Sequence, residues 1–444
     1  MVETENKIQR YNKYKDSGAR WLGKIPEHWK LVRSKRLFEV RKVRANKDDE
    51  QLTASQKYGV IPQIKYMELE GRKVTQVEFN PEILKQVKKG DFVISMRSFQ
   101  GGIEFCNYDG CVSSAYVPLI PIKHIETSFF KYLFKSKSYI SELSSTSNLV
   151  RDGQALRFDN FSQVDLLIIP LEEQTKIAQF LNNKTTKIDK AIAIKKQQIN
   201  LLKERKQILI HKAVTRGLDD TVKLKDSGVK WIGEIPEHWE VKRFRYVFNL
   251  GKGLTITKDN LRDEGVFCVN YGEIHSKYGF EIDTNIHKLK CVEEEYLLSN
   301  PKALINKGDF VFADTSEDIE GSGNFTYLKS EDEIFAGYHT VIATPKFEIE
   351  ARFFAYEFES ESFRNQIRTK VKGVKVYSIT QSILKEPTVW YPSKEEQIET
   401  VNFLDVETKK IDTAVSLKQQ EIEKLKEYKS SLINDVVTGK VKVC

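Results

Sequence analysis

Three short strings in this 444-residue chain resemble parts of catalytic motifs, and each lacks something that its chemistry needs. Asn80-Pro81-Glu82-Ile83 is the nearest match to an Asn-Pro-Pro-Tyr tetrapeptide, but it has no aromatic ring to stack on a flipped base. Glu240-Val241-Lys242 could end a metal-dependent nuclease motif, yet no suitably spaced acidic residue precedes it. Gly321-Ser322-Gly323 lacks the third glycine of a cofactor loop, and no GxxxxGK[ST] phosphate loop occurs, so we expect no ATP hydrolysis here.

The cysteines and the seven histidines do not indicate a catalytic or metal site. The cysteines form no CxxC pair and have no zinc-like spacing to a histidine, so we expect reduced thiols in a cytoplasmic protein. The N-terminal segment is polar and no run approaches eighteen apolar residues, so we expect neither a signal peptide nor a membrane span. The pattern is that of a binding protein with no metal or cofactor of its own. The cysteines are Cys106, Cys111, Cys268, Cys291 and Cys444.

Length and composition favour a folded protein of two to four domains. Hydrophobic residues make up 40% of the chain and include 25 Phe, which can supply real cores. The net charge is +8 and the pI is about 8.9. This surplus fits a polyanionic partner, although excess lysine is also common on ordinary protein surfaces, so charge alone leaves nucleic-acid binding open.

Two pairs of matching segments show that the chain is a tandem duplication. Residues 15–33 (KDSGARWLGKIPEHWKLVR) and 225–243 (KDSGVKWIGEIPEHWEVKR), here called the boxes, are identical at twelve of nineteen positions. Residues 185–217 and 408–440 are identical at sixteen of thirty-three positions. The order is therefore box, variable region, helix, and then the same again.

Between the boxes and the helices the similarity falls to short framework strings. VKKGDFVISM at 87–96 resembles INKGDFVFAD at 305–314, and FFKYLF at 129–134 resembles FFAYEF at 353–358. Neutral drift after an old duplication is the simple alternative, but drift would not obviously spare both ends and scramble the middles. We therefore interpret the chain as one shared scaffold that carries two different binding regions.

The second pair of matching segments predicts two long helices, because residues 187–215 contain no Pro or Gly and are rich in Lys, Gln, Leu and Ile. Apolar residues recur at alternating spacings of four and three, the pattern of a coiled-coil seam. The two helices share this register, so we expect them to pair with each other, antiparallel because of the internal two-fold repeat. The alternative is that each packs only on its own domain. The predicted interface residues are Ile188, Ile192, Ile199, Leu202 and Leu209 in the first helix and Ile411, Val415, Ile422, Leu425 and Leu432 in the second.

The first helix carries a second apolar stripe at Ile194, Leu201 and Ile208. Its apolar surface is then wider than one partner helix needs, so an additional protein could dock there. Residues 184–216 also hold ten Lys or Arg against two acidic residues. Such a charged face is usually solvated, but it could face DNA phosphates or an acidic partner.

The two variable regions have mixed patterns that predict an α+β domain of about 150 residues each. The GDFV strings indicate a tight turn that leads into a buried strand. The aromatic residues of the predicted helices are assigned to the core. The predicted strands are 90–95, 112–122, 308–312 and 340–344, and the predicted helices are 128–145 and 351–368.

Together these elements resemble the specificity subunits of type I restriction-modification systems. The resemblance rests on W-[LI]-G-x-I-P-E-H-W, the KGDFV turn, the EEQ entry into a helix and the KID…L…K helix, in the same order in both halves. It implies an α+β fold in which a long antiparallel two-helix coiled coil separates two target-recognition domains, with an internal pseudo-two-fold circular repeat. The implied parts are a first target-recognition domain at 1–175, a central helix at 176–217, a second target-recognition domain at 218–397 and a C-terminal helix at 398–444.

The resemblance also implies a function in which this chain supplies specificity and its partners supply chemistry. Each domain would read one half of a bipartite, asymmetric site in double-stranded DNA. The helix stretch from 188 to 213 spans roughly 39 Å, close to one turn of B-DNA. Two modification subunits would bring S-adenosylmethionine and methylate adenine, and motor-nuclease subunits would use ATP and Mg. The circular repeat predicts that residues 1–30 lie near residues 438–444.

Base reading would need forked donors and acceptors on loops, such as Arg for guanine and Asn or Gln for adenine. The best loops are 95–102 and 151–157 in the first domain, and 270–273, 314–317 and 372–377 in the second. Any of these cations could instead contact a phosphate or form a salt bridge. The predicted DNA-binding residues are Arg97, Ser98, Gln100, Arg151, Gln154, Arg157, Asn270, Tyr271, Ser316, Lys372, Lys375 and Tyr377.

The Trp and Pro residues of the boxes are interpreted as packing at the domain–helix junction and not as DNA contacts. Two other functions stay open at this point. One is a coiled-coil scaffold that binds only proteins, and the other is an enzyme with a cryptic nuclease or methyltransferase site. The box residues concerned are Trp21, Pro26, Trp29, Trp231, Pro236 and Trp239.

Overall fold

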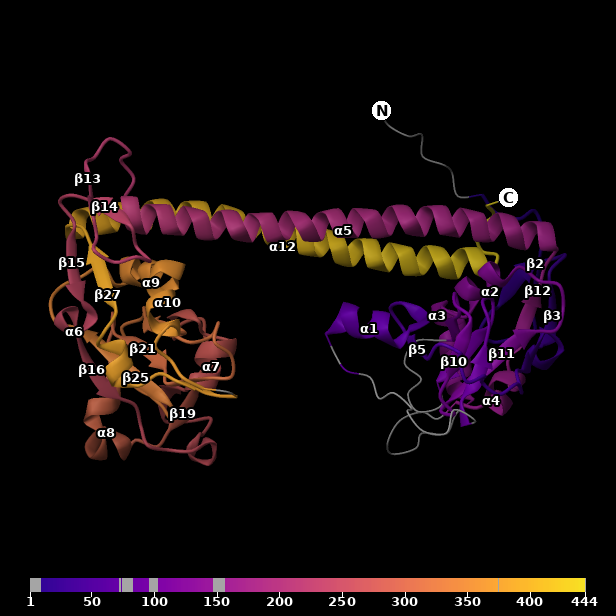
Figure 1. Ribbon diagram of the computed structural model, residues 1–444, viewed down its shortest axis with the longest axis horizontal. Helices are drawn as coiled ribbons and strands as arrows, with labels where there is room; N and C mark the ends of the chain where they lie inside the picture. The colour runs from indigo at the N-terminus through magenta and orange to yellow at the C-terminus, as the bar shows by residue number, and fades with distance from the viewer. Residues whose placement is uncertain are drawn as a thin grey trace. The chain divides into compact units, whose positions relative to one another are not determined.

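The computed structural model describes residues 9–71, 73, 83–95, 103–146, 156–373 and 375–443. The chain forms two compact units. Unit 1 comprises Met1–Lys196 with Gln419–Cys444, and unit 2 comprises Gln197–Lys418. Each unit therefore contains one box, one variable region and a part of both long helices (Figure 1).

Unit 1 is built around a four-stranded antiparallel sheet with the order β4-β11-β8-β9. The first GDFV string forms β8, in which Phe92, Val93 and Ile94 are fully buried. Phe38 from β4 and the rings of the FFKYLF string complete this core. The strands are β1 Tyr14–Asp16, β2 Lys24–Pro26, β3 Lys30–Arg33, β4 Phe38–Val40, β5 Leu52–Ser55, β6 Gly59–Pro62, β7 Lys85–Val87, β8 Phe92–Ser95, β9 Glu104–Phe105, β10 Gly110–Val112, β11 Tyr116–Pro121 and β12 Asp165–Ile168, and the shorter helices are η1 Ser34–Arg36, α1 Gln63–Glu70, α2 Thr127–Leu133, α3 Lys137–Ser145 and α4 Phe158–Gln163.

Unit 2 has the same core arrangement with a larger sheet. The second GDFV string forms β21, which lies inside a five-stranded sheet of order β16-β25-β21-β23-β18. A second sheet of order β19-β17-β24-β20 contributes to two further apolar clusters. The strands are β13 Leu224–Asp226, β14 Glu234–Pro236, β15 Glu240–Arg243, β16 Phe248–Lys252, β17 Val266–Val269, β18 Phe280–Ile282, β19 Lys290–Val292, β20 Leu304–Ile305, β21 Phe310–Ala313, β22 Thr315–Ser316, β23 Phe325–Leu328, β24 Ile334–Ala336, β25 Thr340–Pro345, β26 Tyr377–Ser378 and β27 Thr388–Tyr391, and the shorter helices are α6 Phe244–Val247, η3 Lys258–Asn260, α7 Tyr271–Ser276, α8 Tyr296–Ser299, η4 Pro301–Ala303, α9 Ala351–Glu359, α10 Glu361–Arg368 and α11 Gln381–Leu384.

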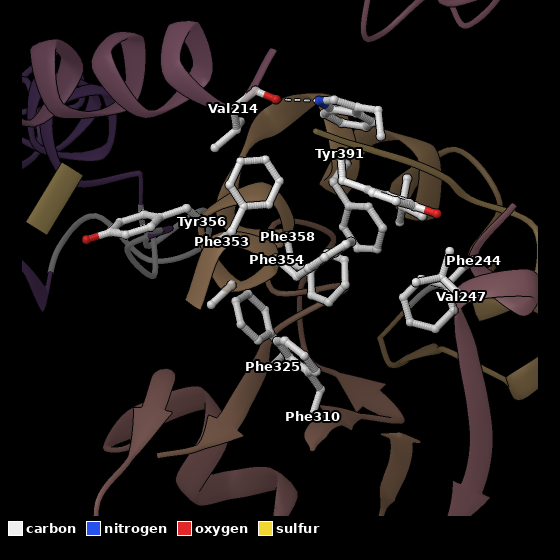
Figure 2. Packing of buried hydrophobic residues seen from close by; sticks show 14 of the residues in the cluster. Val214, Phe244, Val247, Phe310, Phe325, Phe353, Phe354, Tyr356, Phe358 and Tyr391 are labelled. Carbon is white, nitrogen blue, oxygen red and sulfur yellow. Dashed lines mark hydrogen bonds between the residues drawn. The ribbon is translucent and has the colours of Figure 1, made fainter. Parts of the chain in front are cut away.

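The aromatic segments are core, as predicted, and Figure 2 shows the rings of α9 packed among those of unit 2. The segments 128–145 and 351–368 are helical, as predicted, but each forms two helices and not one. Ser136 and Ser360 cause the break, since each side chain caps a new helix by accepting the backbone N–H three residues ahead. The predicted strand 112–122 is likewise interrupted between β10 and β11.

The long helices are α5, Leu171–Arg216, and α12, Lys394–Val437. Both begin before the predicted boundaries at 176 and 398, because the EEQ string forms the first helical turn. In unit 1, Lys429 Nζ lies 2.6 Å from Asp189 and Lys195 Nζ lies 2.5 Å from Glu421. In these two pairs the residue number in α12 falls as the residue number in α5 rises. The helices therefore pair antiparallel, as predicted.

The seam between the long helices uses the residues that their spacing indicated. Ile188, Ile199, Ile411 and Ile422 are buried, and the other six predicted interface residues are half-buried. In unit 2, Lys206 Nζ lies 2.7 Å from Asp412. The second stripe is solvent-exposed, with relative exposures of 56% at Ile194, 56% at Leu201 and 61% at Ile208.

The helices also pack on the globular cores, so the alternative to mutual pairing describes part of the structure. Ile177 and Leu181 of α5 and Val436 of α12 belong to the core of unit 1. Val214 of α5 and Leu404 of α12 belong to the core of unit 2. In both units the start of one long helix and the end of the other therefore contribute to the same core.

Candidate nucleic-acid interface

A buried glutamate in the first turn of α5 anchors the first box. Glu173 accepts hydrogen bonds from Trp29 Nε1 at 3.2 Å and Tyr11 Oη at 2.6 Å, and its carboxylate lies 2.8 Å from His28 Nε2. Trp29 is fully buried, so the carboxylate satisfies an indole N–H that water cannot reach. The His-Trp pair of the box is thus tied to the EEQ string.

The same junction is repeated in unit 2. Glu396, in the first turn of α12, accepts from Trp239 Nε1 at 3.0 Å and lies 2.8 Å from His238 Nε2. Trp239 and Pro236 are buried. The prediction that the box residues pack at the domain–helix junction is therefore confirmed for these residues and for Trp29 and Pro26.

Two box tryptophans are less enclosed. Trp21 is half-buried and contacts Tyr139 edge-on, with ring centroids 5.7 Å apart. Trp231 is 41% exposed, so its ring remains accessible.

The first box also meets the end of α12, as the circular repeat predicts. Tyr14 Oη donates to the carbonyl of Gly439 at 3.1 Å, and Gln9 pairs with Lys442 as an antiparallel bridge. A Cβ at Gly439 would lie 2.4 Å from Pro26, so a glycine is needed where the box crosses the helix end. The prediction that residues 1–30 lie near 438–444 is confirmed for the described residues.

The predicted base-reading loops of the second domain converge on one cleft of about 750 Å³ in unit 2. Tyr271 and Gly272 line it from α7, Val376 lines it from the 372–377 loop, and β22 with the loop after it contributes Thr315, Ser316, Glu317, Asp318 and Glu320. Ser316 pairs with Tyr377 across β22 and β26, which joins the last two loops. Residues more than a hundred positions apart in the sequence are thus brought together, as a composite binding site requires.

Tyr271 lies in an aromatic group at this cleft. Its ring centroid is 5.3 Å from that of His339, 5.7 Å from Tyr338 and 6.2 Å from His275. His339 has a positive φ of 56°, which is uncommon for a residue other than glycine and marks a position held by its surroundings. Flat rings held in this way can contact bases through their faces and edges.

A directional hydrogen-bond chain fixes one wall of the cleft. Arg364 Nη1 donates to Asn324 Oδ1 at 2.6 Å, and Asn324 Nδ2 lies 2.8 Å from His275 Nδ1. His275 Nε2 lies 2.8 Å from the carbonyl of Thr315. The two ring nitrogens of His275 thus each have one hydrogen-bond partner. The loop that carries Ser316 is therefore held from behind.

Ser316 lies at the same cleft and is only 4% exposed. A Cβ added at Gly321 would lie only 2.6 Å from its Oγ. The glycine therefore leaves room for the Ser316 hydroxyl, which can donate and accept hydrogen bonds.

Asn270, another predicted DNA-binding residue, is buried and makes hydrogen bonds within the protein. It is 2% exposed, its Oδ1 accepts from Tyr338 N at 3.2 Å and its Nδ2 donates to Glu273 at 3.2 Å. Both ends of its amide are therefore occupied, and it caps α7 so that Tyr271 points to the cleft. Lys372 and Lys375 are exposed on the adjoining loop.

In the first domain, Arg157 is exposed at the start of α4, and its backbone N–H donates to Asn160. The predictions for Arg97, Ser98, Gln100, Arg151 and Gln154 lie outside the described residues.

Several residues of this interface were missed from the sequence. His275, Asn324 and His339 are isolated polar residues without motif spacing, and only the fold brings them to Tyr271. Glu173 and Glu396 could have been found, because the EEQ and HW strings are both repeated in the two halves.

Nothing in the described residues forms a metal-binding group of three or more His, Cys, Asp or Glu side chains. The four cysteines that the structure describes are free and buried, and burial raises the pKa of Cys106 to about 11. Over the same ranges, none of the helices is both long and apolar enough to cross a membrane.

Comparison with known proteins gives one consistent family. Residues 26–204 and 236–427 match the sequence model described as type I restriction modification DNA specificity domain. The MjaVIII specificity subunit of Methanocaldococcus jannaschii is 26% identical over 371 residues, covering 82% of this chain and 81% of that protein. The EcoKI specificity subunit of Escherichia coli is 25% identical over 413 residues, covering 86% and 82%.

Two solved structures share the fold. A chain of a type I R-M system, from work on its complex assembly and conformational transition, has a TM-score of 0.69 at 13% identity and covers 93% of this chain and 98% of that one. The HsdS subunit from Thermoanaerobacter tengcongensis has a TM-score of 0.51 at 14% identity, with coverages of 94% and 98%.

Proposed function

Because the chain belongs to the family of type I restriction-modification DNA specificity domains and carries two of them, we propose that each unit reads one half of a bipartite, asymmetric DNA site. The family membership makes the chain a DNA-specificity subunit and not the catalytic subunit. The observation that carries the proposal is that the boxes and long helices, here called the frame, make corresponding contacts in both units around loops that differ. Glu173 and Glu396 make the same junction, whereas the cleft at Tyr271 is formed by loops that do not match the first domain.

In the second half-site we assign base reading to the cleft of unit 2. Tyr271 and Ser316 line it, Tyr377 pairs with Ser316 beside it, and the carboxylates of Glu317 and Asp318 add acceptors. Carboxylates accept from the exocyclic amines of cytosine and adenine in the major groove. Lys372 and Lys375 are placed to contact phosphates beside these bases.

We assign the chemistry to partner subunits. Two modification subunits would supply S-adenosylmethionine and methylate adenine, and motor-nuclease subunits would supply ATP and Mg for cleavage, in the cytoplasm. The exposed stripe of Ile194, Leu201 and Ile208 supports a protein contact along α5, because exposed apolar side chains are usually scattered singly and not gathered in a row on one helix face.

The test is to map methylated adenines in the genome of the host. We expect one split motif with a fixed gap. Replacing residues 34–170 with those of a relative should change one half of the motif and leave the other half and the gap unchanged. A change in both halves would contradict two independent readers.

Two further assays separate the alternatives. A purified chain that methylates or cuts DNA without partners would favour a cryptic enzyme. A complex that binds all DNA sequences equally in a gel shift would favour a scaffold that binds only proteins.

A further inference from the structure

The helices α2 and α9, which carry the FFKYLF and FFAYEF strings, are here called the aromatic helices. Each unit contains a recess where its aromatic helix faces the long helices. In unit 1 the recess has a volume of about 310 Å³ and lies between α2 and α12. In unit 2 it has a volume of about 520 Å³ and lies between α9 and both long helices. Both are lined by a tyrosine and a lysine that correspond in the repeat, Tyr132 with Lys429 and Tyr356 with Lys206. The recesses therefore belong to the duplicated frame and not to the divergent loops.

In the recess of unit 1, one lysine has no carboxylate partner among the described residues. Lys135 forms an ion pair with Glu104, and Lys429 Nζ lies 2.6 Å from Asp189. Lys131 has no carboxylate partner among the residues that the structure describes, and its Nζ lies 5.6 Å from the ring centroid of Tyr132. Burial, with Lys429 nearby, lowers the pKa of Lys131. A half-buried cation without a counterion is costly, so this arrangement favours an anion that the free protein lacks.

The recess of unit 2 obtains its positive charge from other positions. Arg352 pairs with Glu281 and Asp405, and Lys206 pairs with Asp412. Lys203 and Lys277 line the same recess and are exposed, and neither has a carboxylate partner within the described ranges.

The aromatic helices of the two repeats carry their basic residue at positions that differ by about one helical turn. The residue that corresponds to Lys131 is Ala355, and Arg352 lies three positions before it. Positions three apart lie on the same face of a helix. The two aromatic helices therefore both present a cation toward the long helices, although the sequence position differs.

We propose that the two recesses are binding sites for phosphates of the DNA backbone, one for each half-site. The proposal rests on the proposed function, in that DNA is the ligand. Phosphates repeat identically along both strands whatever the bases, so their contacts suit the duplicated frame, whereas base contacts suit the divergent loops. The recesses would set the position of each reader on the duplex without contributing to sequence choice.

The experiment measures DNA binding by the full chain in complex with its modification subunits, for wild type and Lys131→Met, from 50 to 200 mM salt. Each lost phosphate contact should reduce the steepness of log affinity against log salt by about 0.9. Between 50 and 200 mM salt, the fall in the affinity of the variant should therefore be about 3.5-fold smaller than the fall in the affinity of wild type. The affinity for cognate and non-cognate duplexes should fall equally. The methylation motif should not change.

Thermal unfolding separates a binding role from a structural one. Because Lys131 is half-buried without a carboxylate, Lys131→Met should unfold at the same or a higher temperature than wild type while it binds DNA more weakly. Lys131→Arg should keep the wild-type slope. Lys137→Met, an exposed lysine at the start of α3 outside the recess, is the matched control and should change neither quantity. In unit 2, Lys203→Gln with Lys277→Gln should also reduce the slope.

An unchanged salt slope in Lys131→Met would overturn the proposal. If that variant instead assembles poorly with the modification subunits in the absence of DNA, the recess binds an acidic protein surface. A loss confined to cognate DNA would make Lys131 a base reader, which also contradicts the proposal. A wild-type complex that does not prefer any DNA sequence would refute the proposed function itself, and this result is distinct from the other three.

Discussion

Replacing Glu173 by alanine should destabilise unit 1 more than the matching change at Glu396 destabilises unit 2. The two glutamates occupy the same position in the repeat and both accept the indole N–H of a box tryptophan. Glu173 is the more enclosed, with 11% side-chain exposure against 29%, and it also accepts from Tyr11. The pair therefore tests how much burial and one extra partner add to an otherwise identical junction.

The magnitude follows from what alanine leaves behind. In Glu173→Ala the Nε1 of fully buried Trp29 loses its acceptor, which costs about 1–3 kcal/mol. Loss of a carboxylate from the first turn of a helix adds about 0.3–1 kcal/mol. With the Tyr11 hydroxyl also released, we expect a total of about 2–4 kcal/mol for Glu173→Ala. For Glu396→Ala we expect about 1–2 kcal/mol, because water can reach part of that junction.

The assay is urea unfolding of the full chain, followed by tryptophan fluorescence, with both alanine variants and both glutamine variants. Glutamine keeps an oxygen acceptor for the indole, so Glu173→Gln should recover at least half of the loss. Equal losses for the two alanine variants, or a glutamine variant as unstable as the alanine one, would refute the reasoning that the satisfied indole carries the effect.

Two other changes test the interior and the seam. Glu357 is fully buried in α9, where its Oε1 accepts from Trp390 N and its Oε2 has no partner among the residues that the structure describes. Burial raises its pKa well above the usual value of 4.5. The stability gained from holding this group protonated is fully present below pH 4.5 and is lost as the pH rises toward the folded-state pKa. In chemical unfolding between about pH 5 and 8, the free energy of unfolding of Glu357→Gln should therefore fall less than that of wild type. In the seam, Ile188→Ala should cost about 2–5 kcal/mol, whereas Ile194→Ala, at an exposed position on the same helix, should stay within about 0.5 kcal/mol; similar losses in thermal unfolding would contradict the assigned faces.

The features that could be predicted from the sequence are those that repeat or are periodic. The alternation of four and three placed Ile188 and Ile411 in the seam, because a heptad pattern reports directly which face of a helix is covered. The match between the two boxes placed the first box beside the end of α12, because equal segments in an internal repeat make equal contacts. These inferences needed no knowledge of long-range packing.

The features that could not be predicted depend on contacts between distant residues. Ser136 and Ser360 lie among several other serines in segments that were predicted as helical throughout, and only the turn of the chain onto the core makes each of these two a cap. The cleft at Tyr271 was predicted as separate loops, but the group that holds them, from Arg364 through Asn324 to His275, has no local signal. Propensity and periodicity are local, whereas a binding site of this kind is assembled by the tertiary fold.

The repetition of polar contacts explains how two unlike readers can share one chain. Gln174 accepts from the N–H of Glu126 at 2.9 Å, and Gln397 accepts from that of Glu350 at 2.9 Å; each bond fixes the cap of the aromatic helix to the start of a long helix. Because these bonds lie in the frame, changes in the loops of one reader leave them intact. Within each unit the frame can therefore keep the same internal contacts while the loops of that unit diverge, which is what the proposed reading of two different half-sites requires.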